Sequence, residues 1–108
     1  MNVWLDDKRP MPPGFDVWTT NAYHAVKFLK CGLVDMISLD HDLAEKTTVG
    51  DGYVVAKAIE EMVCTGHLKR KLTVLLHSMN PVGVTNMKMA ILAAVHEGDI
   101  VTLLEVQR

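Results

Sequence analysis

Two carboxylates separated by an imidazole follow one short apolar run of this sequence. The run covers residues 36–39 and is typical of a buried strand, and Asp40, His41 and Asp42 come directly after it. Carboxylates bind metal ions and imidazole titrates near neutral pH, so the triplet can carry catalytic chemistry. The triplet alone equally fits a polar turn, in which Asp42 caps the next segment and His41 is solvated. The segments elsewhere in the chain distinguish between these two interpretations.

Two further apolar runs, residues 2–5 and 72–76, also end in polar side chains. The residues that follow these runs are Asp6, Asp7, His77, Ser78 and Asn80. Ligands of open parallel sheets bind at the carboxyl ends of the strands, where the ends of neighbouring strands meet. If the three strands are neighbours, these side chains converge on one crevice, and that convergence favours a site.

The remaining segments supply the elements of such a sheet. The patterns predict strands over residues 2–5, 15–19, 36–39, 72–76 and 100–106, and helices over residues 21–31, 53–64 and 81–97. Prolines exclude a helix between the first two strands, so an extended link is expected there. This order predicts an α/β fold, a three-layer sandwich built on a five-stranded, mostly parallel sheet. In the strand order 2-1-3-4-5, the first, third and fourth strands are neighbours.

Composition limits the class of protein. The chain has 108 residues, of which 49% are hydrophobic and 22% are charged, so we expect one domain over residues 1–108. The net charge of −2 argues against a protein that coats DNA. No apolar run approaches the roughly 18 residues of a membrane helix, and no secretion signal opens the chain. We therefore expect a cytoplasmic protein without a membrane partner.

Four large or reactive side chains are expected to be structural. Cys31 and Cys64 share no metal-type spacing and are expected to be buried free thiols. Trp4 and Trp18 lie on predicted strands and are expected to fill the core, with a base-stacking surface as the alternative for Trp18.

A crevice with several carboxylates requires a cation or bound protons, because like charges raise one another's pKa. Oxygen ligands favour Mg²⁺ or Mn²⁺. The helix predicted after Asn80 offers backbone N–H groups to a phosphate, and Ser78 and Asn80 can add hydrogen bonds. His41 or His77 can protonate a leaving oxygen or activate water. This set of groups supports phosphoester hydrolysis or phosphoryl transfer.

Four segments together resemble the cyclic-phosphate-processing receiver-like domain family, a divergent branch of the receiver fold of two-component response regulators. The segments are residues 4–10 (WLDDKRP), 38–43 (SLDHDL), 52–53 (GY) and 77–83 (HSMNPVG). The resemblance implies the strand order 2-1-3-4-5 and an activity on cyclic phosphate ends of RNA or nucleotides. It also implies that Asp6 and Asp7 form the receiver acidic pair, that Asp40 takes the phosphoacceptor position, and that Ser78 is the small hydroxyl residue after the fourth strand.

The chain also departs from an ordinary receiver. A receiver requires a lysine at the end of its fifth strand, where this chain has residues 105–108 (EVQR). The proline-rich link replaces the first receiver helix, and the last receiver helix is missing. Ordinary receivers do not require His41, Asp42, His77 or Asn80, which look like catalytic or ligand-binding groups.

We therefore predict a metal-dependent phosphoesterase that acts on a cyclic phosphate of a nucleotide or an RNA end. The predicted ligands of the divalent ion, Mg²⁺ or Mn²⁺, are Asp6, Asp7, Asp40 and Asp42. The predicted catalytic residues are Asp40, His41 and His77, and the predicted phosphate-binding residues are Ser78, Asn80 and Arg9. Two alternatives stay open: a non-catalytic module that binds a nucleotide or a protein, and a degenerate receiver that accepts phosphate on Asp40.

Overall fold

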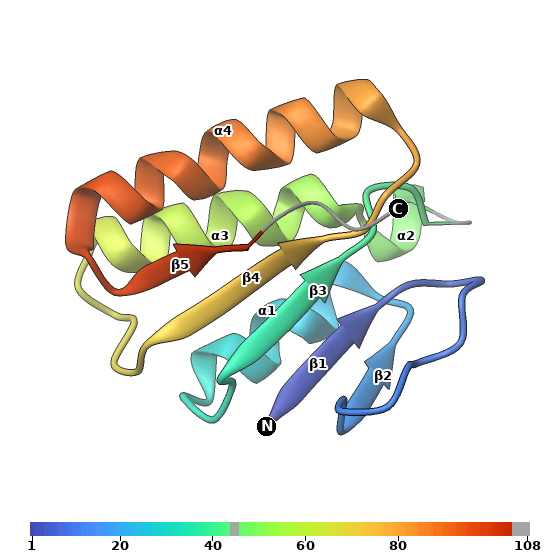
Figure 1. The fold of residues 1–108 in the computed structure, drawn as a ribbon, viewed down its shortest axis with the longest axis horizontal. Helices are drawn as coiled ribbons and strands as arrows, with labels where there is room; N and C mark the ends of the chain where they lie inside the picture. Colours follow the sequence, from blue (N-terminus) through green and yellow to red (C-terminus); the bar gives the residue numbers. More distant parts are fainter. Residues whose placement is uncertain (44–45, 105–108) are drawn as a thin grey trace.

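Five parallel strands form one sheet in the described part of the chain (Figure 1). The computed structural model describes residues 1–43 and 46–104. The strands are β1 (Asn2–Leu5), β2 (Val17–Thr19), β3 (Met36–Leu39), β4 (Leu72–Leu76) and β5 (Val101–Leu103). All four strand pairs are parallel and the order is β2-β1-β3-β4-β5, which confirms the predicted sheet and the receiver-like α/β fold. β5 is shorter than predicted, and residues 105–108, where a receiver would carry its lysine, lie outside the described residues.

Among the described residues, three long helices and one short helix connect the strands. They are α1 (Ala22–Lys30), α2 (Lys46–Val49), α3 (Gly52–Cys64) and α4 (Pro81–Gly98). The side chains of Asn21, Asp51 and Asn80 each accept hydrogen bonds from backbone N–H groups of the first turn that follows, and these caps set where α1, α3 and α4 begin. The predicted helices are therefore correct to within one or two residues, whereas α2 lies in a segment predicted as a polar loop.

The prediction of three layers was wrong. The connections from β2 to β3, from β3 to β4 and from β4 to β5 all cross the sheet in the same direction. Because such crossovers are right-handed, α1, α3 and α4 lie on the same face of the sheet, where α3 packs between α1 and α4 (Figure 1). Alternate strand residues, such as Leu5 and Leu39, belong to the core beneath these helices. The other face would be covered by the first and last receiver helices. Both are absent from the described part of the chain, so the fold has two layers there.

Side chains and the proline-rich link cover part of the face without helices. Trp4 points to this face and is only 6% exposed. Its ring packs edge-on against Phe15 of the link, with 5.2 Å between ring centroids, and its indole N–H donates to the Arg9 carbonyl at 3.0 Å. The link therefore holds its place against β1 without forming a helix.

Three side chains lie elsewhere than predicted. Trp18 is 46% exposed and does not fill the core, because it lies on the edge strand β2 and faces the side without helices. Cys31 and Cys64 are free as predicted, but they are exposed because both lie at helix ends. None of the described helices is long and apolar enough to cross a membrane.

Candidate functional site

The polar residues after β1, β3 and β4 are held by the sheet itself. The backbone N–H of Asp40 donates to the Leu5 carbonyl at 3.0 Å, and that of His77 donates to the Leu39 carbonyl at 3.0 Å. The ladder thus continues one residue beyond each strand. The ends of the three neighbouring strands lie at one edge of the sheet, as the spacing in the sequence predicts.

Asp6, Asp7 and Asp40 form a cluster that we call the acidic triad. Each offers a carboxylate oxygen, and these oxygens all lie within 4.8 Å of one another. Asp6 is 1% exposed, and its Oδ1 accepts the backbone N–H groups of Lys8 and Arg9 at 2.8 and 3.0 Å. Asp7 Oδ1 is buried and has no hydrogen-bond partner. A buried carboxylate oxygen without a donor is costly, so the triad has the character of a cation site.

The electrostatics of the triad act on Asp40. Burial of this carboxyl, together with the negative charge of Asp6, raises the pKa of Asp40 to about 6. A hydrogen bond with Ser78 and the positive charge of Arg9 act in the opposite direction. The carboxyl therefore gains and loses its proton near physiological pH, and a bound cation would favour the ionised form.

Asp40→Asn is expected to stabilise the metal-free protein at neutral pH. Because the folded pKa of Asp40 lies above its ordinary value of 3.8, the folded wild type holds an extra proton between these pH values, and its stability falls as the pH rises through this interval. The variant should therefore gain on the order of 1 kcal/mol above pH 6, since the carboxyl is partly solvated, and nothing below pH 4. Urea unfolding between pH 4 and pH 8 measures this difference, and a gain independent of pH would contradict it.

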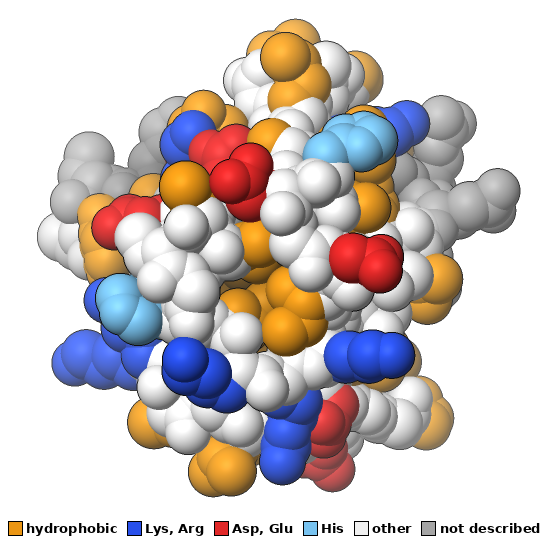
Figure 2. Space-filling model, turned by 90° about the vertical axis from the view of Figure 1, so that its left-hand side faces the viewer, with side chains coloured by type: hydrophobic (Ala, Val, Ile, Leu, Met, Phe, Trp, Pro, Cys, Tyr) orange, Lys and Arg blue, Asp and Glu red, His pale blue; other side chains and the backbone are white. Residues whose placement is uncertain are grey.

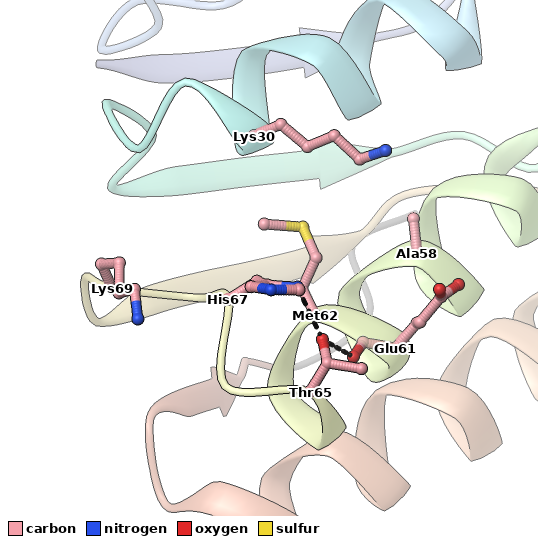
Figure 3. A pocket seen from close by; sticks show the side chains of 7 residues that line it. All are labelled: Lys30, Ala58, Glu61, Met62, Thr65, His67 and Lys69. Atoms are coloured by element: carbon pink, nitrogen blue, oxygen red, sulfur yellow. Dashed lines mark hydrogen bonds between the residues drawn. The ribbon is translucent and has the colours of Figure 1, made fainter.

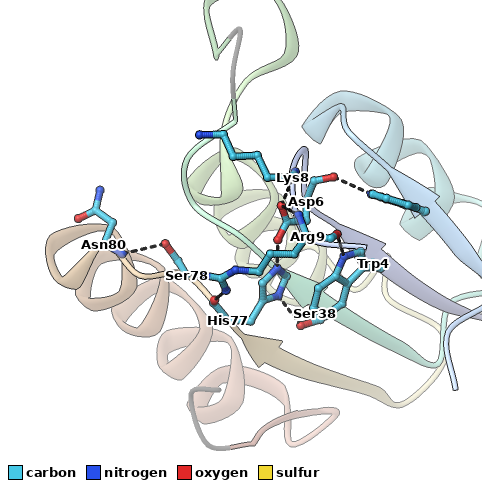
Figure 4. Close-up of polar contacts among 9 residues, drawn as sticks. Trp4, Asp6, Lys8, Arg9, Ser38, His77, Ser78 and Asn80 are labelled. Atoms are coloured by element: carbon cyan, nitrogen blue, oxygen red, sulfur yellow. Dashed lines mark hydrogen bonds and ion pairs between the residues drawn. The ribbon is translucent and has the colours of Figure 1, made fainter. Parts of the chain in front are cut away.

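His77 is buried behind the triad. The residue is 2% exposed, and its ring nitrogens Nε2 and Nδ1 lie 2.9 Å from Asp6 Oδ2 and 2.7 Å from Ser38 Oγ, respectively (Figure 4). The Trp4 ring stacks on it with 3.9 Å between centroids. Burial lowers the pKa of His77 against the opposing effect of Asp6, so the ring is neutral, Nε2–H donates to Asp6 and Ser38 donates to Nδ1. Both ring nitrogens are engaged, which favours a positioning role for His77; the catalytic role stays a prediction.

A second polar group lies around His41. His41 Nδ1 is 2.9 Å from Asp42 Oδ1, and its Nε2 is 3.8 Å from Asp51 Oδ2. Asn80 donates from Nδ2 to both carboxylate oxygens of Asp42, at 3.3 and 3.1 Å. Asp42 is not a member of the acidic triad, contrary to its prediction as a metal ligand, because the chain turns after Asp40 and directs this carboxylate to His41 and Asn80.

Two glycines allow the helices to approach these polar groups closely. A Cβ on Gly52, the first residue of α3, would lie 2.2 Å from the Asp40 carbonyl oxygen. A Cβ on Gly83, in the first turn of α4, would lie 2.4 Å from Cγ of the His41 ring. Glycine is therefore required where α3 packs on the Asp40 backbone and where α4 packs on His41.

Gly83→Ala is expected to destabilise the protein by about 1–3 kcal/mol, because the added methyl group overlaps the His41 ring. In a His41→Gly background the same change should be neutral or slightly stabilising, since both the ring and the Cβ that the added methyl group would meet are gone and alanine favours a helix. A double-mutant cycle measured by urea unfolding isolates this coupling. Equal costs in both backgrounds would show that Gly83 does not hold the His41 ring in place.

Ser78, Asn80 and Arg9 lie beside the triad. The Ser78 side chain is hydrogen-bonded with Asp40, and its hydroxyl oxygen accepts the backbone N–H of Asn80 at 3.1 Å. The Arg9 guanidinium donates to the His77 carbonyl, and Figure 4 shows the Arg9 side chain extending toward His77 and Ser78. The predicted phosphate-binding residues thus come from the link after β1 and from the segment that connects β4 to α4.

A groove at the opposite end of the molecule is separate from this site. It has a volume of about 560 Å³ and lies between the C-terminal ends of α1 and α3. Figure 2 views this end and shows hydrophobic side chains in a hollow, with lysine and arginine side chains nearby. Figure 3 shows Lys30, Met62, His67 and Lys69 along the groove. Because the helices end where the parallel strands begin, the groove lies away from the acidic triad.

The fold and the acidic triad define a protein of the receiver-like α/β class. The family model described as the cyclic-phosphate processing receiver domain matches residues 1–93, and the chain belongs to this family. No curated protein and no solved structure matches the chain. The resemblance seen in the motifs is therefore confirmed over most of the sequence.

Several residues that organise the site were missed by the sequence analysis. Ser38 and Trp4 hold the His77 ring, but in the sequence they are indistinguishable from ordinary strand residues. Asp51 caps α3 and faces His41. Its signal was available, because an aspartate directly before a predicted helix is typical of a cap.

Proposed function

We propose that this chain is a metal-dependent phosphoesterase that hydrolyses a cyclic phosphate of a nucleotide or an RNA end. The observation that carries the proposal is the acidic triad with the buried, unpartnered Asp7 Oδ1. The family's association with cyclic phosphates supports the class of substrate. We also propose a cytoplasmic location, which the two free cysteines favour because such thiols persist in reducing compartments.

The triad fits a hard divalent cation. Three carboxylates offer oxygen ligands only, which is the preference of Mg²⁺ and Mn²⁺, and the unpartnered oxygen of Asp7 would gain a partner. When bound, such an ion neutralises the charge of the phosphate and makes a bound water a stronger nucleophile. Asp6, Asp7 and Asp40 would hold it, with Asp6 kept in place by His77.

The remaining groups act on the phosphate. Hydrolysis forms a bond from the water oxygen to phosphorus and breaks the bond from phosphorus to one ribose oxygen. The ribose oxygen takes up a proton, and the attacking water releases one to the solvent. Arg9 supplies positive charge, and Ser78 and Asn80 supply hydrogen bonds that orient the phosphate. His41 is the proton donor in this proposal, because its Nε2 is 3.8 Å from Asp51 and so lies beyond hydrogen-bond distance of that carboxylate.

The direct test is turnover. The purified protein is incubated with a nucleoside 2′,3′-cyclic phosphate and Mg²⁺ or Mn²⁺, and the products are identified by mass spectrometry. We expect a nucleoside monophosphate that carries the mass of one added water, and no product in the presence of a chelator. Tight binding by calorimetry without any product would contradict the proposal and would favour the non-catalytic binding module.

A further inference from the structure

Trp18 is a large aromatic side chain that the packing of the protein leaves half exposed. It pairs in register with Trp4 on the neighbouring strand, so both side chains point to the face of the sheet that the described helices leave open. Trp4 is buried beneath Phe15 and His77, whereas Trp18 is 46% exposed. The core therefore gains little from an indole at this position, and the exposed part of the ring is open to a ligand.

A hydrogen bond fixes this indole at the candidate site. Trp18 Nε1–H donates to the backbone carbonyl of Asp6 at 2.7 Å. Asp6 is a member of the acidic triad and Asp7 follows it directly. The polar edge of the ring therefore contacts the backbone that carries two of the proposed cation ligands. The bond anchors the ring by its polar edge and leaves its orientation settled before a ligand arrives.

We propose that Trp18 is the base-stacking subsite for the nucleoside whose cyclic phosphate binds at the acidic triad. Aromatic side chains stack on nucleobases of any sequence, because every base has a π face. The ribose joins base and phosphate, so a base on Trp18 places the cyclic phosphate toward Asp6 and Asp7. This inference rests on the proposed function and deepens it, since it distinguishes a nucleoside substrate from a base-free cyclic phosphate.

The test compares ligands with and without a base. Binding of a nucleoside 2′,3′-cyclic phosphate, of ribose 2′,3′-cyclic phosphate and of a short oligonucleotide ending in a cyclic phosphate is measured by calorimetry, and turnover is followed in parallel. Trp18→Leu removes the aromatic ring, whereas Trp18→Phe keeps a π face and loses the hydrogen bond to Asp6. Leu33→Ala serves as the control, because Leu33 is also exposed and lies at the opposite end of the strands.

We expect Trp18→Leu to weaken binding of the base-containing ligands by about 10- to 100-fold and to leave the base-free ligand unchanged. Trp18→Phe should recover most of this loss, and Leu33→Ala should resemble the wild type. A dependence on Trp18 with the mononucleotide, the oligonucleotide or both supports the subsite, and the tighter of the two identifies the source of the cyclic phosphate.

Other outcomes separate the subsite from the proposed function. Equal losses for ligands with and without a base, with Trp18→Phe as impaired as Trp18→Leu, would overturn the subsite and reduce Trp18 to a support for the Asp6 backbone. Base-dependent binding through Trp18 without turnover would uphold the subsite and refute the phosphoesterase. A kcat/KM for the nucleoside 2′,3′-cyclic phosphate that is unchanged in Trp18→Leu would uphold the phosphoesterase and refute the subsite.

Discussion

Asp40→Asn is expected to lower kcat for a nucleoside 2′,3′-cyclic phosphate by at least about a hundredfold. The amide keeps the shape of the side chain but removes one of three negative charges that would hold the cation, and asparagine cannot exchange a proton near neutral pH. Steady-state kinetics at saturating Mn²⁺ measure the loss. The same variant is expected to be more stable than the metal-free wild type at neutral pH, so unfolding cannot account for it.

Asp99→Asn is the matched control for this variant. Asp99 is exposed, follows α4 with a left-handed φ of 52°, and precedes β5. It therefore lies at the amino-terminal ends of the strands, whereas the triad lies at their carboxyl-terminal ends. Asparagine tolerates this backbone conformation, so the control should keep full activity. Wild-type activity in Asp40→Asn, or an equal loss in Asp99→Asn, would contradict the assignment of Asp40.

The second large effect is expected at His77, where substitution by Gln and by Asn tests the hydrogen bonds of the two ring nitrogens one at a time. Gln extends its amide to the position of Nε2 and can still donate to Asp6, whereas Asn reaches only the position of Nδ1 and can bond Ser38. His77→Asn leaves the buried Asp6 Oδ2 without its donor, which should cost about 1–3 kcal/mol of unfolding free energy. His77→Gln leaves this bond in place and should cost less.

The affinity for Mn²⁺ separates positioning from stability alone. If His77 orients Asp6 for the cation, calorimetry should show affinity close to wild type in His77→Gln and at least about tenfold weaker binding in His77→Asn. Both variants lose the stacking on Trp4, so the comparison isolates the bond to Asp6. Equal affinities in the two variants would show that this bond does not position the ligand.

The sequence predicted the sheet and the residues at its edge because local patterns carry both. Apolar runs that end in Asp6, Asp40 and His77 mark the strands, and the order of strands and helices along the chain indicates a parallel sheet. Parallel strands bring their ends together, so the convergence of the triad followed from topology alone. Asp7 was placed correctly for the same reason, since it continues directly from Asp6.

The sequence failed where the outcome depends on which face of the sheet is covered or on where the chain turns. Trp18 has the pattern of a core residue, but it lies on the edge strand β2 and faces the side of the described sheet that carries no helix, so it is exposed. Asp42 has the same spacing from Asp40 as a second ligand, but a turn after the strand directs it to Asn80. The burial of His77 behind Asp6 was likewise not predicted, because it depends on the distant residue Trp4.

The central claim is that the acidic triad holds a divalent cation beside the cyclic phosphate. A crystal structure with Mn²⁺ and a nucleoside 2′,3′-cyclic phosphate tests it most directly, because manganese is located by its anomalous scattering. We predict one Mn²⁺ bound by carboxylate oxygens of Asp6, Asp7 and Asp40, with the phosphate next to it. A phosphate bound at Asp40 with no manganese between the three carboxylates would contradict the claim.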